Sequence, residues 1–185
     1  GNRIYDNTGD GIRINSSITN NFKQNDIYNN NLFGIYINIS TKNIFSSNFI
    51  YNNSISGIYL QSSANNNTIV GNNIYNNTNN GIDSDGFSNN LNITTNNIYN
   101  NTIDGIHVSS TNNTIFNNTI HNNIGSGIYL DASNNNTLSN NTIYNNSWDG
   151  ISLYFSNNST LIHNTVYQSS LAGIRIENSS NNLII

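Results

Sequence analysis

The segment Asn141–Leu153 reads NTIYNNSWDGISL, and its pattern of apolar residues and asparagines recurs along the whole chain. Its central Gly-Ile pair has counterparts at intervals of 22 to 24 residues. The eight pairs begin at Gly11, Gly34, Gly57, Gly81, Gly105, Gly127, Gly150 and Gly173. A fixed period of this length indicates a repeat protein, in which each unit buries its apolar face against its neighbours.

Three more apolar columns accompany the Gly-Ile pairs. One lies eight residues before each paired isoleucine: Ile4, Ile27, Ile50, Ile74, Ile98, Ile120, Ile143 and Val166. Another lies five residues earlier again: Phe22, Phe45, Ile69, Ile93, Ile115, Leu138, Leu161 and, opening the next turn, Ile184. The last lies two residues after the paired isoleucine, where only Ser84 breaks the column: Ile14, Ile37, Leu60, Val108, Leu130, Leu153 and Ile176.

Three short segments with period-2 alternation in each repeat predict three short strands per coil. We therefore predict one all-β domain over residues 1–185: a right-handed, single-stranded parallel β-helix (solenoid) of eight coils of about 23 residues. Repeat lengths vary only between the column after Gly-Ile and the next strand. This is what a stack of equal coils with one variable loop allows.

Asparagine marks the predicted corners, because it tolerates left-handed backbone and caps its own turn. One column is unbroken and predicts a ladder of amide hydrogen bonds between coils. It contains Asn2, Asn25, Asn48, Asn72, Asn96, Asn118, Asn141 and Asn164. A second corner carries Asn-Asn pairs such as Asn76-Asn77, so asparagine ladders are expected at both corners. The recurring glycine marks either a third corner or a close approach of two backbones.

Composition argues against several classes of partner. The chain has only five Lys and Arg and a net charge of −4, so it offers no basic patch for nucleic acid or an anionic membrane. No apolar run approaches the roughly 18 residues of a membrane span, so no membrane insertion is expected in this segment. His107, His121 and His163 lie in different columns with no Cys or Met beside them, so no metal site is predicted.

The unit quoted above resembles the repeats of the right-handed parallel β-helix proteins of the carbohydrate-binding and sugar-hydrolase type. That group includes archaeal adhesin-like surface proteins and, more distantly, pectate lyases and polygalacturonases. The resemblance covers the whole chain and implies the fold. The Asn-, Ile- and Tyr-rich composition is most similar to archaeal surface proteins, which implies an extracellular or cell-surface location.

The chain holds nearly a whole number of coils and shows no capping segment. Solenoids usually have caps that cover the edge strands. We therefore expect it to be part of a longer solenoid or to stack end to end or laterally with copies of itself. The expected partners are the protein itself or cell-surface glycans.

A column of aromatic residues follows the second apolar column and is expected on the outer surface. Its candidate carbohydrate-binding residues are Tyr28, Tyr51, Tyr75, Tyr99 and Tyr144. Tyrosine suits sugar rings because it has an apolar face and a polar tip. The alternative is that stacked tyrosines simply stabilise the rod. Tyr36, Tyr59 and Tyr129 form a shorter outer set with the same two interpretations.

Acidic residues gather in coils 4 to 6. The candidate catalytic residues are Asp83, Asp85, His107 and Asp131, with Asp104 nearby. Asp83 and His107 share a column on adjacent coils, roughly 5 Å apart. The Asp-Ser-Asp-Gly run at 83–86 could alternatively bind Ca²⁺, and no other cofactor is expected. The third interpretation is that these acids are scattered on a soluble rod without a common role.

Asn-x-Ser/Thr sequons are frequent, and those in the variable loop are the best placed glycosylation acceptors. They are Asn15, Asn38, Asn112, Asn135, Asn157 and Asn178. Together these features predict an extracellular, noncatalytic β-solenoid scaffold, adhesin-like or filament-forming and N-glycosylated. The alternatives are a carbohydrate-binding module or a polysaccharide hydrolase or lyase.

Overall fold

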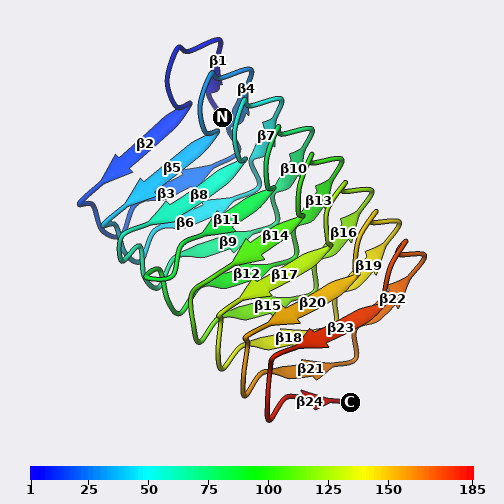
Figure 1. The fold of residues 1–185 in the computed structure, drawn as a ribbon. Helices are drawn as coiled ribbons and strands as arrows, with labels where there is room; N and C mark the ends of the chain where they lie inside the picture. The colour runs from blue at the N-terminus through cyan, green and yellow to red at the C-terminus, as the bar shows by residue number, and fades with distance from the viewer.

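The computed structural model describes residues 1–185 as a solenoid of stacked coils, each contributing one strand to each of three eight-stranded parallel sheets (Figure 1). Sheet A contains β1 (Arg3–Tyr5), β4 (Asp26–Tyr28), β7 (Phe49–Tyr51), β10 (Asn73–Tyr75), β13 (Asn97–Tyr99), β16 (Thr119–His121), β19 (Thr142–Tyr144) and β22 (Thr165–Tyr167). Sheet B contains β2 (Ile12–Asn15), β5 (Ile35–Asn38), β8 (Ile58–Gln61), β11 (Ile82–Ser84), β14 (Ile106–Val108), β17 (Ile128–Asp131), β20 (Ile151–Tyr154) and β23 (Ile174–Glu177). Sheet C contains β3 (Asn21–Lys23), β6 (Ile44–Ser46), β9 (Thr68–Val70), β12 (Asn92–Thr94), β15 (Thr114–Phe116), β18 (Thr137–Ser139), β21 (Thr160–Ile162) and β24 (Leu183–Ile184).

The predicted right-handed parallel β-helix is therefore confirmed, with its three strands per coil. The chain runs in one direction along the rod, so that its two termini lie at opposite ends (Figure 1). No helix of the chain is long and apolar enough to cross a membrane.

The core is a single cluster of 26 buried residues running along the inside of the rod. The predicted columns supply almost all of it, and equivalent residues are in register, as for Ile50 beside Ile74 and Ile74 beside Ile98. Burying each of these side chains contributes about 1.5–3 kcal/mol. Since one coil has too few of them to offset the entropy of ordering its backbone, the coils stabilise one another.

Asparagine ladders hold the corners together. At the corner between sheets C and A, Asn48 donates from both its backbone N and its Nδ2 to Asn72 Oδ1, each at 2.9 Å. The same Nδ2 also donates to the carbonyl of Phe22 at 2.9 Å. The ladder at the corner after sheet A is built the same way, with Asn77 Nδ2 donating to Asn101 Oδ1 at 3.1 Å. Both predicted ladders are thus present.

A third asparagine ladder, which the sequence did not indicate, precedes sheet C. Asn43 and Asn113 donate from Nδ2 to Asn67 and Asn136 at 3.1 and 3.0 Å. Leu91 interrupts this column in coil 4, where its backbone N still donates to Asn113 Oδ1 at 2.8 Å. The column lies two residues before the apolar column of sheet C in every coil, but Leu91 and Ser159 interrupt its run of asparagines.

The recurring glycine marks a close approach between coils, which decides between the two alternatives stated above. A Cβ placed on Gly105 would lie 2.7 Å from the carbonyl oxygen of Gly127 in the next coil and would also collide with Ile120 Cγ2. The backbone carbonyl cannot move away without breaking the ladder of sheet B. Any side chain at this position therefore forces the coils apart.

We predict that Gly105→Ala lowers the free energy of unfolding by about 2–3 kcal/mol, the scale of overpacking in a close-packed interior. Gly86→Ala is the matched control, because the nearest atom to its added Cβ is the carbonyl oxygen of Ser109 at 3.7 Å, an ordinary contact. Thermal unfolding followed by circular dichroism measures both. Equal stability of the two variants would contradict the close-approach explanation.

Left-handed backbone occurs at the corner after sheet A, where asparagine is well suited. Six asparagines there have φ between 54° and 58°: Asn29, Asn52, Asn76, Asn100, Asn122 and Asn145. The corner after sheet B is less well matched, because Ile39 and Phe155 have φ of 48° and 47° there. Both side chains are about half exposed. A β-branched residue in this conformation is strained.

We predict that Ile39→Asn raises the free energy of unfolding by about 1 kcal/mol, because asparagine adopts the left-handed conformation with less strain. The control is Ile44→Asn, which replaces a comparably exposed isoleucine inside β6. That change is expected not to stabilise, since isoleucine favours strands. Denaturant unfolding of both variants tests the point, and a loss of stability in Ile39→Asn would refute it.

Candidate functional site

The predicted aromatic column forms an uninterrupted stack on sheet A. Ring centroids from Tyr5 to Tyr167, with His121 in line, are 4.7–5.1 Å apart, and the ring planes lie within 1–9° of parallel. Within the stack each ring has both faces covered by its neighbours, so only edges are open to solvent. Carbohydrate binding stays a prediction for Tyr28, Tyr51, Tyr75, Tyr99 and Tyr144, whose rings stack along the rod in the structure.

Coil 4 departs from the repeat for a local structural reason. Asp85 accepts hydrogen bonds from the backbone N of Ser62 (2.7 Å), the backbone N of Phe87 (3.0 Å) and Ser88 Oγ (2.8 Å). Ser84, at the apolar position, is buried, and its hydroxyl lies 2.9 Å from Ser110 Oγ. Asp85 thus caps its own loop and ties it to coil 3.

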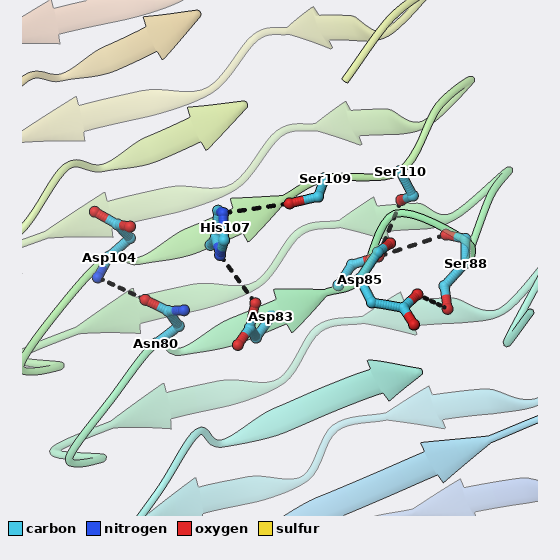
Figure 2. A network of polar contacts seen from close by, with 9 residues as sticks. Asn80, Asp83, Asp85, Ser88, Asp104, His107, Ser109 and Ser110 are labelled. Atoms are coloured by element: carbon cyan, nitrogen blue, oxygen red, sulfur yellow. Dashed lines mark hydrogen bonds and ion pairs between the residues drawn. The ribbon is translucent and has the colours of Figure 1, made fainter. Parts of the chain in front are cut away.

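Asp83 and His107 meet on the outer face of sheet B. They are paired residues on β11 and β14, and Asp83 Oδ1 lies 3.0 Å from His107 Nδ1 (Figure 2). His107 also stacks on Tyr129, with ring centroids 5.3 Å apart. Burial lowers the pKa of His107, but the hydrogen bond and charge of Asp83, with the charges of Asp104 and Asp131, outweigh it and raise the pKa.

Such a carboxylate–imidazole pair can hold and move a proton, so the catalytic prediction for Asp83, Asp85, His107 and Asp131 remains open. Asp131 lies half-buried on the same face, beside Tyr154 of β20. No group of three or more His, Cys, Asp or Glu side chains is placed to hold a metal ion.

A groove of about 370 Å³ opens next to this pair, along coils 5 to 8. Its residues come from two places: the turns that lead into β14, β17 and β20, and the outer face of β17, β20 and β23. They are Ile103, Asp104, Ser126, Tyr129, Trp148, Asp149, Ser152, Tyr154, Arg175 and Glu177.

The groove exists because a small residue stands in a column of large ones. Ser152 of β20 pairs with Tyr129 on one side and Arg175 on the other. The equivalent position carries Tyr59 and His107 elsewhere on sheet B, so Ser152 leaves a gap between two long side chains. Trp148, the only tryptophan of the chain, borders this gap with its side chain more than half exposed.

Burial sets the electrostatics of the groove. It raises the pKa of the buried Asp104 carboxyl to about 6, against the opposing effects of the Ser126 backbone N–H, 2.6 Å from Oδ1, and of His107. Burial together with Asp131 and Asp104 also raises the pKa of the Tyr129 hydroxyl. Acidic and aromatic side chains thus line the same groove.

Sequence analysis missed most of this groove. Trp148, Ser152, Tyr154, Arg175 and Glu177 were not selected, although Tyr129 belonged to the shorter outer tyrosine set. A signal was present in the outward-facing residue that directly follows each paired isoleucine. Its type changes from coil to coil, whereas the residue types in the columns of sheet A repeat. The change to serine in coil 7 could have indicated a hollow.

The predicted glycosylation sites lie at the end of a sheet B strand, as Asn15 of β2 and Asn38 of β5 do, or in the loop between sheets B and C. Asn15, Asn112, Asn135 and Asn178 are exposed. Asn38 and Asn157 are half-buried, and their Nδ2 atoms donate to Asn15 and Asn134 at 2.7 and 3.1 Å respectively. N-glycosylation stays a prediction, and the four exposed sites are the most accessible.

The molecule is thus a parallel β-solenoid with one hollowed outer face. It belongs to the right-handed β-helix family, whose description, "right handed beta helix region", matches residues 1–113 and 85–185. No curated protein matches the sequence.

Solved structures share this architecture at low sequence identity. The A-module of the mannuronan C-5 epimerase AlgE6 of Azotobacter vinelandii has a TM-score of 0.78 at 20% identity, over 99% of this chain and 56% of its own. The periplasmic alginate epimerase AlgG has a TM-score of 0.81 at 20% identity, over 99% and 50%. Pectate lyase Pel9A has a TM-score of 0.56 at 16% identity, over 99% and 50%. The chain spans about half the length of these proteins, and the likeness shows a fold shared with carbohydrate-active enzymes.

We predict that Asp104→Asn removes a pH dependence of stability. The folded protein holds the Asp104 proton more tightly than the unfolded chain, so stability falls as pH rises from about 4 through about 6, by on the order of 2 kcal/mol. Asparagine keeps an oxygen for the Ser126 N–H, as Asn80 Oδ1 does for the N–H of Asp104 at 3.0 Å.

Denaturant unfolding at a series of pH values measures this effect, and the variant should gain stability above about pH 6 relative to the wild type. Deprotonation of His107, whose pKa is also raised, lowers stability as pH rises. The variant and the wild type are therefore compared at each pH of the same series. Asp6→Asn controls for the loss of an exposed carboxyl outside the groove. Parallel pH profiles for Asp104→Asn and the wild type would rule out the buried-acid explanation.

Proposed function

We propose that this protein is a noncatalytic, extracellular β-solenoid scaffold that binds a polysaccharide segment in the groove beside Trp148. The observation that carries the proposal is the groove itself, with aromatic rings and hydrogen-bonding carboxylates on its walls. Its volume lies within the range of small-ligand sites, roughly 300–1,000 Å³.

The aromatic residues of the groove differ from the sheet A stack in what they offer a ligand. Trp148 is exposed and has no aromatic stacking partner, while the tyrosines of sheet A cover one another. A sugar ring packs its C–H face on a flat aromatic face, and its hydroxyls pair with nearby polar groups. Arg175, Glu177 and Asp149 supply such groups within the same groove.

The names of the structural neighbours support the ligand class. They belong to enzymes of mannuronan, alginate and pectate, all of which are polysaccharides. A solenoid presents an extended face along its axis, which suits an extended chain. The uniform remainder of the rod, with its ladders and aromatic stack, serves as the scaffold, and glycosylation of the exposed sequons is part of this proposal.

The single tryptophan makes the test direct. We expect a glycan array to yield a ligand that changes the fluorescence of Trp148 on titration, since no other tryptophan contributes. By calorimetry, Trp148→Ala should weaken binding of that ligand at least about tenfold, as for an aromatic anchor.

Phe49→Ala is the control, because it removes a comparably exposed aromatic ring from β7 on sheet A, outside the groove. The proposal fails if no glycan on the array binds. It also fails if Trp148→Ala and Phe49→Ala bind a ligand equally well.

A further inference from the structure

The charges around the groove are strongly segregated by sign. Six of the nine acidic residues lie in coils 4 to 8, on or beside the strands of sheet B: Asp83, Asp85, Asp104, Asp131, Asp149 and Glu177. Of the five Lys and Arg, four lie in coils 1 and 2, and only Arg175 lies near the groove. The groove therefore lies in the most acidic part of the molecule.

The cations that are present near the groove already have partners. Arg175 donates from Nε and Nη2 to Glu177 Oε2, at 3.0 and 2.6 Å. His107 faces Asp83 at 3.0 Å. The other four acids, Asp85, Asp104, Asp131 and Asp149, form no ion pair, although Asp104 and Asp131 lie near enough for their charges to act on His107.

Asp149 is a largely buried carboxylate, 4% exposed, that lines the groove. Its Oδ1 accepts the backbone N–H of Ala172 at 3.0 Å, which fixes the side chain in the turn before β20. Its Oδ2 has no hydrogen-bond partner within the chain. This atom is not among the solvent-inaccessible polar atoms that lack a partner. Trp148, the preceding residue, lines the same groove.

We propose that the glycan held in this groove carries amino sugars, and that a protonated amine pairs with Asp149 while a sugar ring packs on Trp148. This inference rests on the proposed function and names its ligand class. An ammonium group is attracted both to a carboxylate and to the face of an indole ring. A uronate would bring its own negative charge against unbalanced carboxylates with no free cation to receive it.

Three tetramers of similar size separate the possibilities: β-linked glucosamine, the same tetramer with every amine acetylated, and a uronic acid. Titrations near pH 6 follow Trp148 fluorescence. We expect glucosamine to bind at least about tenfold more tightly than its acetylated form, and the uronate to bind most weakly. The difference should shrink in about 0.5 M salt, because part of it is a screened charge interaction.

Variants test whether the Asp149 carboxylate causes the preference. Asp149→Asn keeps the oxygen that receives the Ala172 N–H, so it removes charge with little change of shape. This variant should bring the affinities for glucosamine and its acetylated form to within about twofold. Asp6→Asn removes one charge in coil 1 and should leave the tenfold preference unchanged.

The outcomes distinguish this inference from the proposed function. Equal or tighter binding of the acetylated or uronate tetramer in the wild type would overturn the amino-sugar assignment while leaving a glycan groove. A glucosamine preference that survives Asp149→Asn would overturn the role of this carboxylate. Absence of any glycan ligand, on the array and among the tetramers, would refute the proposed function itself.

Discussion

The stacking of equivalent residues in consecutive coils is the constraint on which the rest of the structure depends. Neighbouring strands of a sheet are about 4.8 Å apart, so every side chain meets its own counterpart at that distance. Asparagine amides meet this requirement by donating and accepting in the same direction, as Asn48, Asn72 and Asn96 do. Aromatic rings meet it by lying parallel, and glycine meets it where two backbones touch.

This constraint divides the surface into uniform and variable faces. On sheet A the same residue types repeat, and the aromatic rings contact their counterparts in the coils above and below. On sheet B the outward-facing residue directly after each paired isoleucine differs between coils, as in Tyr59, Asp83, His107, Tyr129 and Ser152. Side chains of different type on adjacent coils cannot stack on or hydrogen-bond to one another as completely as identical side chains do. The ion pair of coils 4 and 5 and the groove of coils 5 to 8 both arise there.

Departures from the repeat have two different consequences in this protein. In coil 4 the polar replacement Ser84 and the adjacent Asp85 are absorbed by local hydrogen bonds, so the departure remains structural. In coil 7 Ser152 leaves a space that no other side chain fills, and Trp148 and Tyr154 border it. A broken pattern thus indicates where to look, and the surrounding side chains decide whether the space is filled or open.

The sequence by itself determined the fold, the number of coils, the core columns, two asparagine ladders and the pairing of Asp83 with His107. It could do so because a solenoid converts a fixed sequence period into a spatial neighbour, so contacts between coils can be counted along the chain. The tertiary structure alone decided the left-handed Ile39, the capping by Asp85 and the groove. Each of these depends on the path of a loop of variable length or on side-chain volume and direction, which a period does not encode.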